Sequence, residues 1–236
     1  LECVKEAAGE IRLDIEAAFS QGLPSTPMAH SKVRVVSGNF VTARPMGVID
    51  GTDLALTGVV RKVDTEALRF VLANGGLVLL SPLGFSPTGE AFNLTMEDVA
   101  CSVATALKAD KLVLLTETSG ISDAAGQLLN ELSVEDAERM LGAGEVSGDA
   151  AFNLRYAVRA CRGGVARAHI LSYALDGGLL VELFTHEGVG TMVAPENLEK
   201  MRDATSDDVG GIIKLIEPLE ADGTLVKRPR ELIERE

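Results

Sequence analysis

The chain has 236 residues, 46% of them hydrophobic and 24% charged, which is typical of a soluble globular protein with one large domain or somewhat more. Its formal net charge of −13 argues against nucleic acid as a partner, because polyanion binding needs clustered Lys and Arg. No apolar run approaches the ~18 residues of a membrane span and no signal peptide is visible, so we expect a cytoplasmic protein with no membrane partner.

The first elements of the chain follow a helical and then a strand pattern. Residues 2–19 carry apolar side chains at helical spacing and predict an amphipathic helix. Residues 33–36 and 40–43 predict two strands joined by a hairpin turn at Ser37-Gly38-Asn39. The predicted apolar face of the helix consists of Val4, Ala7, Ala8, Ile11, Ile15 and Phe19.

A strand, a helix and a strand are predicted next. Residues 44–51 are rich in turn formers and lead to a strand at 56–64. Asp64 can cap a helix that ends at Gly75-Gly76. The apolar run 77–80 is of the kind buried on both faces of a parallel sheet, so this order predicts a βαβ unit.

The same alternation continues through the middle of the chain. Residues 81–92 predict a loop or hairpin, and Thr95 to Asp98 has the spacing of a capping box. Residues 111–116 form a second buried strand. Helices are expected from Ser133 and over 152–161, and residues 168–173 supply a third strand of the sheet. The alternation predicts a three-layer α/β/α sandwich with a mostly parallel sheet, in which ligands bind outside the carboxyl ends of the strands.

Residues 168–193 contain the densest group of polar side chains at the ends of elements. A helix is predicted over 178–184, with Leu179, Leu180 and Leu183 on one face. Four polar residues lie at strand or helix ends: His169, Asp176, Glu182 and Thr185. Backbone N–H and C=O groups at such ends lack hydrogen-bond partners within their own element. The spacing permits a small-molecule pocket, but a strand, turn and helix whose polar residues are purely structural is the commoner arrangement.

The cysteines and the two ends of the chain set further expectations. Cys3, Cys101 and Cys161 are odd in number and far apart, so they indicate neither a disulfide framework nor a metal site. The chain begins with Leu1, and its last residues stop inside a predicted helix, so we interpret it as a fragment of a longer protein. Helices predicted after residue 205 and after Gly223 suggest that a second domain begins near residue 198.

Six ordered blocks resemble bacterial N-acetylglutamate synthases along nearly the whole chain. They are VVSGNFVTARPMGVIDG, TGVVRKVD, SPLGFSPTGEAFNLTMEDVA, AVRACRGGVARAHILSY, DGGLLVELFTHEGVGT and RDATSDDVGGIIKLIEPLEADGTLVKRPRE. The resemblance implies an amino-acid-kinase-like domain over residues 1–197, lacking its first strands. It also implies the beginning of an acetyltransferase domain of the GNAT superfamily over residues 198–236.

The resemblance also implies an activity and its site residues. The family transfers an acetyl group from acetyl-CoA to the amino group of L-glutamate, the first step of arginine biosynthesis, and L-arginine regulates the reaction. His169, Glu182 and Gly188 match arginine-pocket positions, with Glu182 expected to accept a bidentate guanidinium, and Arg228 matches a residue that binds the carboxylate of glutamate. Catalytic residues are expected beyond Glu236, so the fragment should be inactive alone; no metal is implied, and a homo-oligomer is expected.

Two alternatives remain open. N-acetylglutamate kinases share the kinase-like domain, but Glu97 stands where these kinases have Asp and Asn153 falls near their Lys, which favours a domain that has lost phosphoryl transfer. The other alternative is a stand-alone arginine-binding module.

Overall fold

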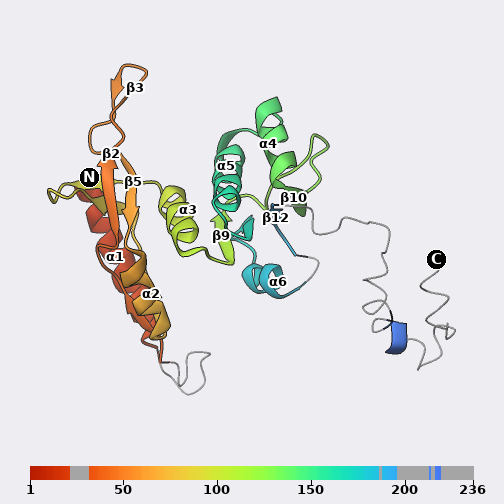
Figure 1. Cartoon of the computed structure of the whole chain (residues 1–236), viewed down its shortest axis with the longest axis horizontal. Helices are drawn as coiled ribbons and strands as arrows, with labels where there is room; N and C mark the ends of the chain where they lie inside the picture. Colours follow the sequence, from red (N-terminus) through yellow and green to blue (C-terminus); the bar gives the residue numbers. More distant parts are fainter. Residues whose placement is uncertain (22–31, 186–187, 196–212, 214–215, 219–236) are drawn as a thin grey trace. The chain divides into compact units, whose positions relative to one another are not determined.

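The computed structural model describes residues 1–21, 32–185, 188–195, 213 and 216–218 (Figure 1). The chain divides into two compact units, residues 1–197 and 198–236. The acetyltransferase character of residues 198–236, the helix expected after Gly223 and the position of Arg228 lie outside the described residues and stay predictions. Of the helix expected after residue 205, residues 213 and 216–218 are described, and they are helical. All elements described below belong to the first unit.

The helices are α1 (Glu2–Phe19), α2 (Thr65–Ala73), α3 (Met96–Leu107), α4 (Val134–Ala143), α5 (Gly148–Arg162) and α6 (Gly178–Phe184). The strands are β1 (Arg34–Val36), β2 (Val41–Pro45), β3 (Val48–Ile49), β4 (Thr52–Asp53), β5 (Gly58–Val63), β6 (Gly76–Val78), β7 (Leu83–Phe85), β8 (Ala91–Asn93), β9 (Lys111–Thr116), β10 (Glu131–Ser133), β11 (Arg167–Ser172) and β12 (Thr191–Ala194).

One sheet has the strand order β10-β12-β11-β9 and carries the site described below. β9 and β11 are parallel neighbours, β10 and β12 are also parallel, and β12 runs antiparallel to β11. α3, α4 and α5 contribute to the core on one face of this sheet, while α6 contacts the other face at β11. This arrangement confirms the predicted three-layer α/β/α architecture with mostly parallel pairing.

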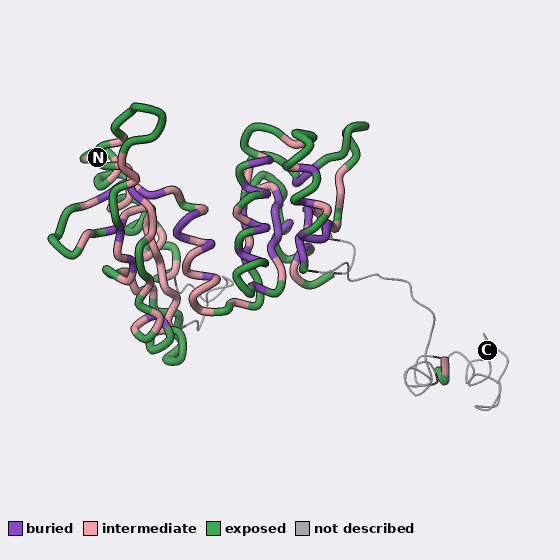
Figure 2. Tube along the Cα trace, turned by 45° about the horizontal axis from the view of Figure 1, so that its top comes forward, coloured by how far each residue is buried: buried purple, intermediate pink, exposed green. Residues whose placement is uncertain are grey.

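The core of this sheet follows the alternation of side chains along its strands. Leu112 and Leu114 of β9 and Ala168 and Ile170 of β11 face the same helices, because every second residue of a strand points to one side. Figure 2 shows buried residues along these strands and on the helix surfaces turned toward them. Each fully buried leucine or isoleucine side chain of this kind contributes roughly 1.5–3 kcal/mol. His169 and Leu171 point to the opposite face of β11.

The predicted helix starts are confirmed by their capping side chains. Asp64 Oδ1 accepts the N–H of Ala67 at 3.0 Å, Thr95 Oγ1 accepts that of Asp98 at 3.2 Å, and Ser133 Oγ accepts that of Asp136 at 3.0 Å. Each cap supplies a partner for one of the N–H groups that a helix start leaves open, typically worth ~1 kcal/mol.

A second sheet has the order β5-β2-β7-β8. β7 and β8 form an antiparallel hairpin. Residues 81–92 were expected to form either a loop or a hairpin, and the hairpin is the structure observed. Val41, Ala43, Phe92 and Leu94 pack there against Val99 of α3. Because α3 also contributes Cys101 and Ala104 to the core of the first sheet, one helix serves both cores.

Two predictions about strand pairing and one about strand burial were wrong. β1 and β2 do not form a hairpin: β1 pairs in parallel with β6, whereas β2 pairs with β5 and β7. Neither Gly38 nor Asn39 adopts a positive φ, so the two-residue turn that a tight hairpin requires is absent. Consequently β5 and β6 lie in different sheets and do not make a βαβ unit, and the strand residues of the 77–80 run are only half-buried.

A short hairpin within residues 44–56 was not predicted. β3 and β4 pair antiparallel around Asp50 and Gly51, which have φ values of 49° and 79°. An Asp-Gly pair with positive φ at both positions is the usual two-residue hairpin turn, so the sequence did carry the signal.

The predicted apolar faces of α1 and α6 also differ from the structure. No residue of α1 is buried, and Ile11 is exposed. In α6 the buried residues are Gly178 and Glu182, while Leu179 and Leu180 are exposed. The polar residue of α6, rather than its leucines, therefore faces the sheet.

The three cysteines differ in their burial. Cys3 is exposed, Cys101 and Cys161 are buried, and all three are free thiols. Among the described helices, none combines the length and the apolar character needed to cross a bilayer.

Candidate functional site

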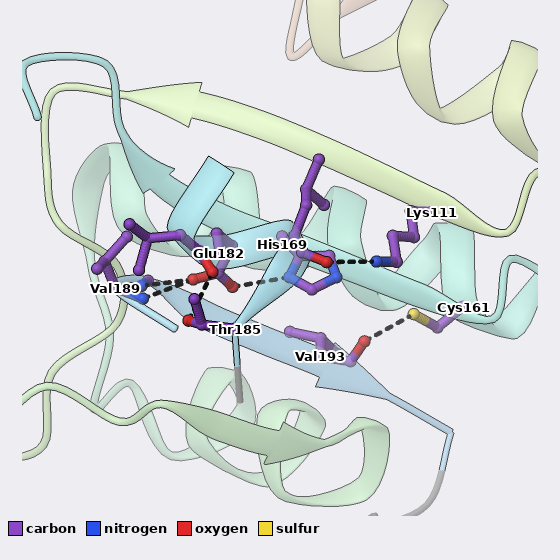
Figure 3. Close-up of polar contacts among 10 residues, drawn as sticks. Lys111, Cys161, His169, Glu182, Thr185, Val189 and Val193 are labelled. Carbon is purple, nitrogen blue, oxygen red and sulfur yellow. Dashed lines mark hydrogen bonds and ion pairs between the residues drawn. The ribbon is translucent and has the colours of Figure 1, made fainter. Parts of the chain in front are cut away.

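The site is centred on two buried side chains that face each other, His169 of β11 and Glu182 of α6 (Figure 3). His169 Nδ1 lies 2.7 Å from Glu182 Oε1, and both side chains are almost completely buried. An ionised carboxylate can only accept hydrogen bonds, so this contact requires a hydrogen on Nδ1 of the imidazole. β11 supplies the histidine because its residues alternate between the helical core and the α6 face.

The second oxygen of Glu182 binds the backbone of the segment that follows α6. Oε2 accepts the N–H of Val189 at 2.7 Å and that of Gly190 at 2.9 Å. Gly188 has a φ of 59°, and a Cβ added there would lie 2.9 Å from Oε2 of Glu182. A glycine at this position therefore allows the backbone to wrap closely around the carboxylate.

These hydrogen bonds determine the charge of Glu182. Burial by itself raises the pKa of this carboxyl, but the hydrogen bonds from His169, Val189 and Gly190 outweigh burial and hold the pKa below its ordinary value. Glu182 is consequently an anion at neutral pH although it is buried. A buried carboxylate with this many donors forms a fixed negative charge beside the sheet.

His169 carries one polar atom without a partner. Nε2 is buried and makes no hydrogen bond with any residue in the described part of the chain. In Figure 3 Lys111 lies beyond the ring, where its Nζ donates to the carbonyl oxygen of Leu183 at 3.4 Å. The lysine thus caps the carboxyl end of α6, where helix carbonyls lack partners.

The backbone around the carboxylate is tied to the loop that follows β9. Thr191 Oγ1 accepts the N–H of Ile121 at 2.8 Å, and both residues are fully buried. A Cβ added to Gly120 would lie 2.5 Å from Thr191 Oγ1, and one added to Gly190 would lie 2.4 Å from the carbonyl oxygen of Ile170. The segment 188–191 therefore fits between β11 and the 116–121 loop with no room for larger side chains.

The residues singled out in the sequence separate into two groups. His169, Glu182 and Gly188 are brought together in the cluster. Asp176 is exposed, and Thr185 Oγ1 donates to the carbonyl of Val181 in its own helix at 2.7 Å. Neither joins the cluster.

The expected role of Glu182 as a bidentate acceptor does not match its present contacts. Both of its oxygens are already used by internal donors, and Oε1 alone retains an acceptor position of the two that an oxygen offers. The sequence could not reveal these internal donors, because two of them are backbone N–H groups.

Sequence reasoning also missed an ion pair that joins three elements. Asp98 of α3 is buried; its Oδ1 accepts from Arg159 of α5 at 2.7 Å and its Oδ2 accepts the N–H of Val60 of β5 at 2.8 Å. The capping-box spacing accounted for Asp98 as a helix-start residue, which concealed its long-range contacts.

The comparisons with known proteins decide the family. The amino acid kinase family model matches residues 5–172. The chain belongs to the amino acid kinase family.

Individual proteins that resemble the chain along its whole length are named as acetyltransferases or synthases. The chain is 61% identical to an amino-acid acetyltransferase of Ralstonia nicotianae, over all 236 residues and 52% of that relative's length. The N-acetylglutamate synthase from Neisseria gonorrhoeae complexed with coenzyme A and L-arginine superposes with a TM-score of 0.85 at 43% identity, covering 99% of this chain and 54% of that one. The same enzyme complexed with coenzyme A and N-acetyl-glutamate gives a TM-score of 0.76 at 45% identity, covering 100% and 53%. The chain thus spans about half the length of these relatives.

Asn153, which the resemblance puts near the lysine of the kinases, makes a contact within its own helix. The side-chain amide of Asn153 donates to the carbonyl of Asp149 in its own helix at 2.8 Å. Asn153 is buried, and an amide carries no charge to neutralise a phosphate. No cluster of three or more potential metal ligands occurs among the described residues.

Proposed function

We propose that this chain is the central part of an N-acetylglutamate synthase, which transfers the acetyl group of acetyl-CoA to the amino group of L-glutamate. The observation that carries the proposal is the identity with an amino-acid acetyltransferase along the entire chain, which spans both compact units. The fold alone would not carry it, because one fold supports many functions.

Residues 1–197 would act as the regulatory part, with L-arginine as the effector. The similar synthase from Neisseria gonorrhoeae was solved with L-arginine, and the fixed anion of Glu182 supplies the charge that a guanidinium requires. His169 would orient the carboxylate through Nδ1, and Gly188 would let the backbone approach the ligand closely. With its present contacts Glu182 offers one acceptor position, so a bidentate guanidinium contact would have to displace Val189 or Gly190.

Residues 198–236 would begin the acetyltransferase domain. We assign Arg228 to the substrate carboxylate of L-glutamate, a role that suits a planar guanidinium. The reaction requires a deprotonated amine of glutamate to attack the thioester carbonyl of acetyl-CoA, and backbone donors to polarise that carbonyl. Catalytic groups would lie beyond Glu236, and the intact protein would be cytoplasmic and a homo-oligomer.

The competing function is an ATP-dependent N-acetylglutamate kinase of the same fold. It is not favoured, because the relatives that match the whole chain are named as acetyltransferases and Asn153 has no charge to offer a phosphate. A stand-alone arginine-binding module would fit the His169–Glu182 cluster but not the extent of the identity.

Arginine binding can be tested on the chain itself by thermal unfolding. L-arginine at a hundred times its dissociation constant should stabilise the fold by ~2.7 kcal/mol. L-citrulline has the same shape without the charge and serves as the control. Stabilisation by neither ligand, or by both equally, would remove the sensing role.

Acetyl transfer needs the intact protein that contains this chain. CoA release from acetyl-CoA should depend on L-glutamate and should change when L-arginine is added. Phosphorylation of N-acetylglutamate by ATP, without glutamate-dependent CoA release, would replace the proposal with the kinase.

A further inference from the structure

The two oxygens of the Glu182 carboxylate are unequally occupied by internal donors. Oε1 accepts from Nδ1 of His169, whereas Oε2 accepts from the backbone N–H groups of both Val189 and Gly190. Each oxygen offers two acceptor positions, so Oε1 keeps one open and Oε2 keeps none. A guanidinium commonly binds a carboxylate through two parallel N–H groups, one to each oxygen. Such a ligand therefore requires one of the two backbone donors to leave Oε2.

The N–H of Gly190 is held in place by the packing around it. Gly190 is buried, and a Cβ added to it would lie 2.4 Å from the carbonyl oxygen of Ile170. The next residue, Thr191, pairs with Ile170 between β12 and β11, and its Oγ1 accepts the N–H of Ile121. A buried N–H that loses its acceptor is costly. The bond from Gly190 to Oε2 should therefore persist when a ligand binds.

The N–H of Val189 has more freedom to leave the carboxylate. Val189 is only half-buried, so this N–H can turn toward water. The residue before it, Gly188, has a φ of 59° and no Cβ, so the peptide that joins the two residues can rotate with little steric cost. Hydrogen bonds weaken steeply once their angle falls below about 120°, and a partial rotation is therefore enough to release Oε2.

The space beside Gly188 lies within reach of both carboxylate oxygens (Figure 3). A Cβ built on Gly188 would be 2.9 Å from Oε2 and 3.8 Å from Oε1 of Glu182. Among the described residues, the three atoms nearest to that point all belong to the Glu182 side chain. The point also adjoins the peptide that carries the Val189 N–H. A planar donor placed there would take the acceptor position that Val189 now uses.

We propose that the N–H of Val189 is a switch that exchanges places with the effector. It occupies Oε2 in the free chain and gives way to the guanidinium of L-arginine, while the N–H of Gly190 stays bound. The proposal rests on the arginine-sensing role proposed above and adds how the buried carboxylate stays satisfied when no effector is present. Because the internal bond must break first, the affinity for L-arginine is lower than that of a site left open.

Backbone ester variants of the 236-residue chain test the switch by calorimetric titration with L-arginine. In each variant an α-hydroxy acid replaces one residue, so an oxygen takes the place of the amide N–H and the side chain is unchanged. The ester at Val189 should bind L-arginine about tenfold more tightly than the natural chain, because the acceptor position is already free. The matched ester at Gly190 removes the other donor to the same oxygen and should not strengthen binding. Circular dichroism checks that both variants fold.

Nuclear magnetic resonance on the natural chain tests the switch without a substitution. Scalar coupling through the hydrogen bond joins the amide nitrogen of Val189 to the carboxylate carbon of Glu182, and a second coupling joins Gly190 to the same carbon. Saturating L-arginine should abolish the coupling from Val189 and leave that from Gly190.

The outcomes separate the switch from the sensing role on which it rests. No binding of L-arginine to the natural chain would remove the sensing role and the switch with it. Three results would overturn the switch while the sensing role stands. They are binding that keeps the Val189 coupling, binding that removes the Gly190 coupling instead, and an affinity that the Val189 ester does not raise.

Discussion

His169 of β11 donates through Nδ1 to Oε1 of Glu182 in α6, at 2.7 Å, between two side chains that solvent hardly reaches. The same carboxylate accepts two backbone N–H groups from the segment after α6. One side chain therefore joins a strand, a helix and a loop, and its loss should affect stability as well as ligand binding.

Glu182→Gln should lower the free energy of unfolding by about 2 kcal/mol, since an amide supplies one acceptor oxygen where three donors now converge. Urea unfolding of the two chains measures this difference. Glu10→Gln on the exposed surface of α1 is the control and should change stability by less than about 0.5 kcal/mol. Equal effects of the two substitutions would mean that the buried hydrogen bonds contribute nothing.

The stability due to Glu182 should depend on pH in the acid range. Its pKa in the folded chain lies below the ordinary value of 4.5, so the unfolded chain binds the proton more readily. The contribution is therefore complete above about pH 4.5 and is lost as the pH falls through the lower folded pKa. Unfolding curves from pH 6 downward should show a steeper loss for the natural chain than for Glu182→Gln.

Gly190→Ala should be strongly destabilising because the new methyl group would meet the carbonyl oxygen of Ile170 at 2.4 Å. Overpacking of this kind costs about 1–3 kcal/mol. The matched control is Gly142→Ala in α4, where a Cβ would meet no atom within 4 Å. This substitution should stabilise the helix by about 0.5–1 kcal/mol, because alanine favours a helix interior over glycine. Opposite signs for the two substitutions are expected in thermal unfolding; a neutral Gly190→Ala would contradict the close packing.

Asp98→Ala should lower the free energy of unfolding by about 2–3 kcal/mol, because it leaves the N–H of Val60 and the guanidinium of Arg159 without their acceptor. Arg159→Met should cost less, about 1 kcal/mol, since its side chain is 55% exposed and water can replace the lost contact. Chemical denaturation of both variants gives the comparison, and a larger loss for Arg159→Met would show that the buried carboxylate is not the critical partner.

The three thiols should differ in reactivity. Burial raises the pKa of Cys161 to about 11 and also raises that of Cys101, whereas Cys3 is exposed on α1. Only a thiolate reacts readily, so a disulfide reagent at neutral pH should modify one thiol of the folded chain quickly and all three after unfolding. Rapid reaction of a second thiol in the folded chain would indicate that its helix opens.

The sequence was most informative where one local rule determines an element. Asp64, Thr95 and Ser133 were predicted to cap helices, and each does so, because capping depends on residues within one turn. The strands at 111–116 and 168–173 were likewise found from their apolar runs, although β9 is buried only at Leu112 and Leu114 and exposes Leu115. Such features need no knowledge of distant neighbours.

Pairing between distant segments could not be predicted in the same way. β1 was expected beside β2 because the two are adjacent in sequence, yet its partner is β6, some forty residues away. The prediction that β5 and β6 belong to one βαβ unit failed for the same reason, since the two strands lie in different sheets. In a strand of three residues the side-chain pattern is too short to specify which neighbour it joins.

At the candidate site the sequence indicated the residues but not their bonding. The resemblance brought His169, Glu182 and Gly188 together, and the structure places them in one cluster. That Glu182 would be satisfied by Val189 and Gly190 depends on backbone geometry, which residue identities do not express.

The N–H groups of Ile121, Val189 and Gly190 all donate to side-chain oxygens rather than to the carbonyls of a strand or helix. Their exchange with deuterium is therefore limited by the opening of the cluster and not by the unzipping of a sheet. These three amide resonances would report, residue by residue, whether an effector tightens or loosens this corner of the molecule. They could do so even where the ligand causes no displacement large enough to be seen in a static structure.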